Sequence, residues 1–252
     1  MKTGLRFFVF CFVLLDLLTG SAKSQSQQKK GNVKITFINC MGNQPMSLDS
    51  TYTNCWNESF TISQLKYYIS NIALQTSDHR VTGEQNSYHL VNEAENFSKS
   101  FSFYLSPDKY TSISFLIGVD SLKNVSGAQT DALDPLNGMF WTWNSGYIMF
   151  KMEGNSPQSS AINNKIEYHI GGFAWADNAV KKMVINFPGA PVSLNKKNII
   201  EIIIRTNLDK FWNATNKLKI TQTPVCTTPG VLAAHIASNY AQAFEIVKII
   251  QQ

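Results

Sequence analysis

The sequence predicts an all-β protein: an antiparallel β-sandwich with long loops and one short C-terminal helix. Three observations predict this fold. Apolar and polar residues alternate with a period of two through most of the chain, as in half-buried strands. The alternating segments are rich in Ile, Val, Phe, Tyr and Thr, and Asn, Gly, Pro and Ser separate them. About nine such segments occur without the strand–helix–strand rhythm of a parallel sheet, which favours a sandwich.

The first 24 residues have the features of a secretory signal peptide. Lys2 and Arg6 precede the apolar run FFVFCFVLLDLL, and the small residues of TGSAKS follow it. A charged start, a short apolar segment and a small-residue exit are typical of such a leader, and the apolar run is short for a membrane span. We therefore expect residues 1–24 to be removed and residues 25–252 to form one exported domain, periplasmic or secreted, without a membrane span.

The predicted strands follow the leader in a regular series. They are VKITFIN (33–39), LKYYISNIAL (65–74), SFSFYL (100–105), YTSISFLIGV (110–119), MFWTWNSGYIMFKM (139–152), KIEYHI (165–170), VKKMVINF (180–187) and NIIEIIIRTNL (198–208). TPGVLAAHIASNYAQAF (228–244) is the one helical segment, since Pro229 suits a helix start and Ala follows it. FEIVKII then predicts a closing strand.

The stretch from 118 to 152 is the most informative part of the chain. Residues 118–138 are polar and rich in turn formers, which predicts a long ordered loop of the kind that often carries function. The strand predicted over 139–152 would place Trp141, Trp143, Tyr147 and Met149 on one face and Phe140, Ile148 and Phe150 on the other. Two interpretations stay open, because apolar faces on both sides fit either a covered central strand or an aromatic site.

Composition excludes some classes of protein. Hydrophobic residues make up 44% of the chain and charged residues 15%, which is typical of a globular core. The net charge of +5 is scattered, so nucleic-acid binding is not expected. An exported chain with Cys40, Cys55 and Cys226 predicts one disulfide and one free thiol. Cys40 and Cys55 bracket a short loop and are the favoured pair, although the other pairings stay open.

The residues alone give few signs of chemistry. No nucleophile elbow or His-rich chelate is present in the sequence, so an enzyme is not expected. Among the four histidines, His169 in EYHIGG has the strongest claim to a site, because two glycines let the backbone pass closely. His89 in YHL could lie on a strand face.

Three segments together resemble the MbnP-like family, exported proteins named for a copper-binding member encoded with methanobactin uptake. They are LKYYISNIAL, GVDSLKNVSGAQTDALDPLNGMFWTWNSGYIMFKMEG and YHIGG. The resemblance extends over roughly residues 33–250 and includes IASNYAQAF. It implies an exported copper-binding protein that chelates or delivers copper and is not a catalyst.

The resemblance also implies residue roles. Trp141 and Trp143 match the aromatic motif in which the copper-binding branch can carry a tryptophan oxidised to kynurenine by a partner di-haem enzyme. His169 matches the histidine of the HIGG-like motif, with His89 as a further imidazole. A thioether such as Met139 or Met149 would be a soft ligand, with Met139 the favoured one, because thioethers suit Cu(I).

Two departures from the family pattern support an alternative. Copper-branch sequences commonly read Asn-His before the aromatic strand, where this chain has Asn124-Val125, and they tend to carry a Cys where this chain reads GFAWAD. The alternative is a secreted β-sandwich binding module that has lost the metal site and binds another ligand or a protein partner.

Overall fold

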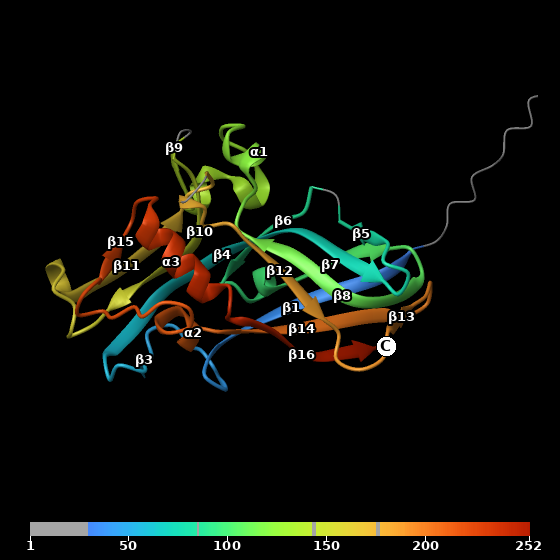
Figure 1. The fold of residues 1–252 in the computed structure, drawn as a ribbon, viewed down its shortest axis with the longest axis horizontal. Helices are drawn as coiled ribbons and strands as arrows, with labels where there is room; N and C mark the ends of the chain where they lie inside the picture. Colours follow the sequence, from blue (N-terminus) through green and yellow to red (C-terminus); the bar gives the residue numbers. More distant parts are fainter. Residues whose placement is uncertain (1–29, 85, 143–144, 175–176) are drawn as a thin grey trace, which may run out of the picture.

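The strands form two facing sheets in the computed structural model, which describes residues 30–84, 86–142, 145–174 and 177–252 (Figure 1). The smaller sheet has the order β16–β14–β1, with β2 and β7 also on β1. The larger has the order β12–β8–β4–β10–β11–β15, with β3, β5 and β6 on β4, β9 on β10 and β13 on β8. The ring of Phe37 in β1 packs between the sheets, with centroids 6.1 Å from Phe115 and 6.2 Å from Tyr67. The predicted all-β sandwich is confirmed.

The bounds of the elements are as follows. The strands are β1 (Gly31–Met41), β2 (Gln44–Pro45), β3 (Thr51–Thr53), β4 (Ser59–Thr76), β5 (Val81–Gly83), β6 (Tyr88–Asn92), β7 (Ser100–Leu105), β8 (Asp108–Ile117), β9 (Phe140–Thr142), β10 (Gly146–Asn155), β11 (Lys165–Gly171), β12 (Lys181–Asn186), β13 (Val192–Leu194), β14 (Ile199–Asn207), β15 (Val225–Cys226) and β16 (Phe244–Gln251). The α-helices are α1 (Ser121–Asn124), α2 (Asp209–Trp212) and α3 (Val231–Tyr240). The 3-10 turns are η1 (Asn96–Lys99), η2 (Asp131–Leu133), η3 (Pro135–Asn137) and η4 (Ile162–Asn164).

β4 is the strand from which the larger sheet branches. Its first half pairs with β10 and its second half with β8, and the register shifts between Ser70 and Ala73. Asn71 lies in this irregular part with a φ of 52°. The other edge of β4 carries β3, β6 and β5. The sheet therefore divides, and the β10–β11–β15 branch extends away from the smaller sheet.

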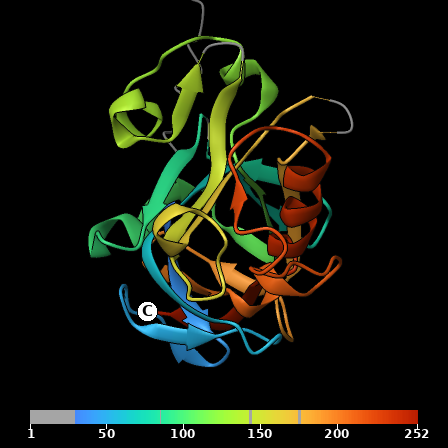
Figure 2. The same cartoon turned by 90° about the vertical axis from the view of Figure 1, so that its left-hand side faces the viewer.

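Two helices cover one face of this branch. Phe150 of β10 stacks on Tyr240 of α3, with centroids 4.9 Å apart, and on Phe211 of α2 at 5.6 Å. Figure 2 shows α3, in red, standing beside β10 and β11. Because side chains alternate along a strand, the residues next to Phe150 and Met152 face away from the helices. This leaves the opposite face of β10 and β11 available for polar side chains.

The single strand predicted over residues 139–152 is wrong. The segment is a hairpin in which β9 pairs antiparallel with β10. Gly146 has a φ of 75°, and a Cβ there would lie 2.3 Å from Oδ1 of Asn124, so this position requires glycine. The turn ends the alternation that the sequence suggested. The four residues from Tyr147 to Phe150 are all buried, so the stretch is a covered strand at its C-terminal half.

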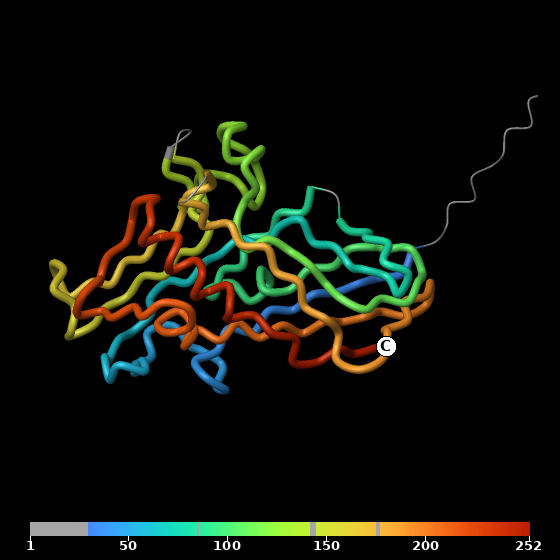
Figure 3. The backbone as a smooth tube through the Cα atoms, in the orientation of Figure 1, coloured from blue at the N-terminus to red at the C-terminus, as the bar shows by residue number. Residues whose placement is uncertain are grey.

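The other end of the chain follows the predictions more closely. The helix predicted over 228–244 is shorter, Val231–Tyr240, and the closing strand is β16. β16 pairs antiparallel with β14, whereas β14 and β1 are parallel, a departure from a wholly antiparallel sandwich. The C-terminus consequently lies at the same end of the molecule as the start of β1 (Figure 3).

The disulfide predicted between Cys40 and Cys55 is wrong. Both thiols are free, as is Cys226. Cys40 is buried at the end of β1, where its thiol contacts the Ile38 carbonyl oxygen, while Cys55 is exposed in the turn after β3. Burial raises the pKa of the Cys40 and Cys226 thiols, which keeps them protonated.

The predicted leader lies outside the described residues. Within the described part of the chain, no helix is long and apolar enough to cross a bilayer.

Candidate metal centre

Four polar side chains meet on the face of β10 and β11 that the helices leave uncovered. The antiparallel register places Lys151 directly opposite His169 and Glu153 directly opposite Glu167. Side chains paired in this way have Cβ atoms about 5 Å apart on one face of a sheet. Met152, Tyr168 and Ile170 point to the other face and are buried.

The distances define a compact cluster. His169 Nε2 lies 2.6 Å from Glu153 Oε1 and 3.6 Å from Glu167 Oε1. Lys151 Nζ lies 3.1 Å from Glu153 Oε1, so the ammonium and the imidazole share one carboxylate oxygen. One potential ligand atom from each of Glu153, Glu167 and His169 lies within 4.8 Å of the others.

The cluster is partly shielded from solvent. The side chain of His169 is 12% exposed, and those of Glu153 and Glu167 are 31% and 34% exposed. Burial raises the pKa of Glu153, but hydrogen bonds from His169 and Lys151 outweigh burial and hold that pKa below its ordinary value. Glu153 is therefore an anion at neutral pH.

Trp141 packs against β11, the strand that carries His169 and Glu167. A Cβ on Gly171 would be 2.5 Å from Cζ3 of Trp141, so the six-membered ring of the indole rests on the backbone of that glycine. Gly171 ends β11, two residues after His169. Trp141 thus contacts β11 two residues along the strand from His169. Trp143 lies outside the described residues.

The methionines lie elsewhere. Met139 is 0% exposed and belongs to the hydrophobic core. Met149 is also buried, and its sulfur accepts a hydrogen bond from Val119 N–H at 3.2 Å. Both thioethers are fully buried, whereas the side chains of the cluster are partly exposed. The role of Met139 as a soft ligand stays a prediction, and the structure places its side chain in the core, away from solvent.

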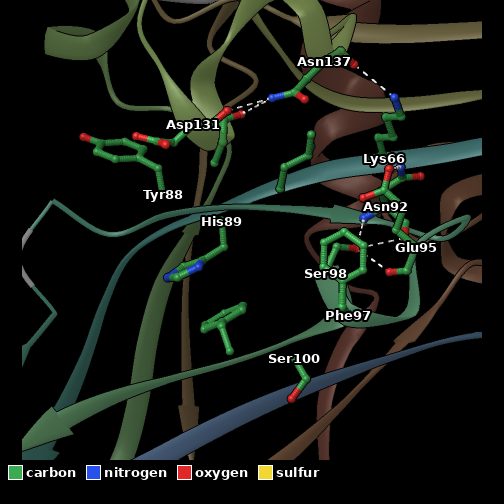
Figure 4. A pocket seen from close by; sticks show the side chains of 13 residues that line it. Lys66, Tyr88, His89, Asn92, Glu95, Phe97, Ser98, Ser100, Asp131 and Asn137 are labelled. Carbon is green, nitrogen blue, oxygen red and sulfur yellow. Dashed lines mark hydrogen bonds between the residues drawn. The ribbon is translucent and has the colours of Figure 1, made fainter.

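His89 also lies apart from the cluster. It is on β6, which pairs with the opposite edge of β4 from β10. Its ring stacks on Phe101 with centroids 3.6 Å apart, and its Nε2 contacts Glu84 Oε2 at 2.8 Å. His89 borders a pocket of about 300 Å³ with Tyr88, Phe97 and Asp131 (Figure 4).

Hydrogen bonds hold the 118–138 segment against β4 and β10, the strand that carries Lys151 and Glu153. Lys66 and Lys151 donate from the sheet to the backbone oxygens of Asn137 and Gly138. Asn124 is fully buried and its side chain bonds Val119 O and Tyr147 N. Val125, where the family pattern has histidine, is 65% exposed.

Sequence reasoning missed Glu153, Glu167 and Lys151. Their alternation in KMEG and KIEYH shows that each pair shares a face of its own strand. The register that brings the two strands together depends on the connection between residues 155 and 165, which alternation does not encode.

The fold and cluster define an all-β protein with a histidine–carboxylate site on its outer face. A model of the MbnP family matches residues 30–228, and the chain belongs to that family. Among solved structures, MbnP from Methylosinus trichosporium is similar with a TM-score of 0.52 and 12% sequence identity, covering 82% of this chain and 87% of that one. This likeness shows a shared fold. No curated protein matches the chain.

Proposed function

We propose that this chain is an exported, non-catalytic protein that binds copper at the outer face of β10 and β11 and chelates or delivers it. Membership of the MbnP family links the chain to methanobactin-associated copper biology. The observation that carries the proposal is the convergence of His169, Glu153 and Glu167 within 4.8 Å, on a pair of strands against which Trp141 packs at Gly171.

The donor set fits divalent copper better than Cu(I). One imidazole and two carboxylates are borderline and hard ligands, and a site of nitrogen and oxygen donors binds Cu²⁺ most tightly among the common divalent first-row metals. The thioethers of Met139 and Met149, of a type that suits Cu(I), lie buried in the core. The chain would therefore take copper as Cu(II).

Binding would exchange internal contacts for metal bonds. The His169 ring nitrogen that contacts Glu153 must offer its lone pair, so any proton it carries moves to solvent or to the other ring nitrogen. Lys151 must leave Glu153 Oε1, because an ammonium and a metal ion cannot occupy one position beside that oxygen. Occupancy thus competes with an internal cation, and copper can be released as well as held.

Trp141 is the candidate for oxidation to kynurenine by a partner di-haem enzyme. Its ring rests on Gly171, near His169, and it is half-buried at the surface. Oxidation would replace an indole, which has no good donor, with a carbonyl and an aryl amine. The mass of the exported protein tests this part of the proposal, since conversion adds oxygen and removes carbon from one tryptophan.

Copper titration of the purified protein tests the site. Cu(II) should bind with one-to-one stoichiometry and quench tryptophan fluorescence, and His169→Ala should abolish that binding without unfolding the protein. His235→Ala is the matched control, because His235 is exposed on α3 and outside the cluster. Equal affinity in His169→Ala and wild type would refute the assignment.

The second candidate function is a secreted binding module without metal. It is favoured by the contacts that Glu153 Oε1 already makes with His169 Nε2 at 2.6 Å and with Lys151 Nζ at 3.1 Å. Failure of the wild-type protein to bind either Cu(II) or Cu(I) would support this alternative.

A further inference from the structure

β6 has one paired edge and one open edge. Among the described residues it pairs with β4 alone, in an antiparallel register that places Leu90 opposite Tyr68 and His89 opposite Ile69. An open edge presents a row of backbone N–H and C=O groups that can pair with another chain.

The hydrogen bonds at the two ends of the β4–β6 ladder show which backbone groups of β6 point away from β4. Asn71 N–H donates to Ser87 O and Glu93 N–H donates to Leu65 O. Residues of odd number in β6 therefore bond β4, because the two kinds of pair alternate along an antiparallel ladder. The N–H and C=O groups of Tyr88, Leu90 and Asn92 point away from β4.

One of these three positions is already occupied. Ser98 Oγ accepts from Asn92 N–H and also contacts Asn92 O, both at 2.9 Å. For the backbone groups of Tyr88 and Leu90, no hydrogen-bond partner occurs in the described part of the chain beyond the β4 ladder, which they face away from. Two ladder positions are thus available on the open edge.

A pocket lies along these positions. Its volume is about 300 Å³, and Leu90, Phe97 and Phe101 supply its apolar lining. Phe97 is 79% exposed, although it is a large apolar side chain. Figure 4 shows Asp131 and Asn137 on one side of this pocket and Phe97 and Ser100 on the other.

The charges around the pocket favour a basic ligand. Asp131 and Glu95 both line it and are exposed. The lysine in the lining, Lys66, donates a hydrogen bond from Nζ to Asn137 O at 3.0 Å, so its ammonium already has a partner in the protein. Two carboxylates therefore face an occupant that reaches the open edge.

We propose that the open edge of β6 binds an extended peptide segment by strand addition, with an apolar side chain against Leu90 and Phe97 and a Lys or Arg side chain beside Asp131 or Glu95. Residues i and i+2 of a strand are about 7 Å apart, so a segment of three or four residues pairs with both Tyr88 and Leu90. Backbone hydrogen bonds supply affinity in this mode, and pockets beside the strand supply specificity. The proposal does not depend on copper binding.

Selection from a displayed library of random octapeptides tests the proposal, with the full exported chain as bait. Enriched sequences should alternate and should carry Lys or Arg next to an apolar position. The best peptide, made synthetically, should slow amide hydrogen exchange at Tyr88 and Leu90. N-methylation of its ladder-facing amides should weaken binding at least tenfold.

Two variants of the protein complete the test. Leu90→Pro removes the outward N–H, which is tolerated on an edge strand, and should abolish peptide binding. Asp131→Asn keeps the ladder and should weaken basic peptides several-fold. A library without enrichment, a peptide that binds equally after N-methylation, or protection at residues outside β6 would overturn the proposal.

Discussion

Lys151 should limit the affinity of the metal site, and its removal should strengthen copper binding. The ammonium lies 3.1 Å from the same Glu153 oxygen that His169 contacts, and it also donates to Gly138 O at 3.3 Å. A metal ion at Glu153 must break the first contact and then repels the ammonium. Lys151→Met keeps the length of the side chain and removes its charge.

The expected size of the effect follows from exposure. Lys151 is 14% exposed and Glu153 is 31% exposed, so their attraction is only partly screened by water. A partly exposed ion pair is worth about 1 kcal/mol, which corresponds to about a fivefold change in a dissociation constant. We therefore expect Lys151→Met to bind Cu(II) about fivefold more tightly.

Isothermal titration with Cu(II) in a weakly competing buffer measures this change. Lys182→Met is the matched control, because Lys182 is exposed on β12, away from the cluster, and its loss lowers the net charge equally. A change of the same size in both variants would mean that only long-range charge matters. Unchanged or weaker binding in Lys151→Met would refute the competition between lysine and metal.

Three further predictions concern the surroundings of the site and the fold. Gly171→Ala should displace Trp141, seen as a red shift in the tryptophan fluorescence difference spectrum and reduced quenching by Cu(II); an unchanged spectrum would contradict the contact. Glu58 is 5% exposed and accepts hydrogen bonds from Asn54, Ile220 and Thr221, so Glu58→Ala should lower the free energy of unfolding by about 3 kcal/mol in urea titration. Because the folded-state pKa of Glu153 lies below its ordinary value of 4.5, its contribution to stability is complete above that pH and is lost as the pH falls through the folded pKa. The difference in urea midpoint between wild type and Glu153→Gln should accordingly shrink on acidification below about pH 4.5, and a constant difference would argue against an ionised, paired Glu153.

Alternation alone predicts much of the fold. It locates β1, β7, β8, β11, β12, β14 and β16 nearly at their bounds, because apolar and polar residues alternate along most of these strands. It fails between residues 139 and 152, since the turn before Gly146 divides one apolar run into two strands. It also says nothing of the parallel pairing of β1 and β14, which depends on contacts between distant parts of the chain.

Only some residues of the candidate site could be predicted from the sequence. Resemblance to a family singled out His169 and Trp141, and the structure packs Trp141 on Gly171, two residues after His169 on β11. Glu153 and Glu167 lie beside His169 because of the pairing register of β10 and β11. The pattern within one strand does not determine that register. Met139 and His89 have suitable chemistry, but one points into the core and the other lies across β4.

Pulsed electron paramagnetic resonance of the protein loaded with one equivalent of Cu(II) tests the copper site most directly. The spectrum should show nuclear modulation from the remote nitrogen of one imidazole, with oxygen donors completing the coordination. This modulation should be lost in His169→Ala and kept in His235→Ala. A spectrum with two or more imidazoles, or one unaffected by His169→Ala, would contradict it.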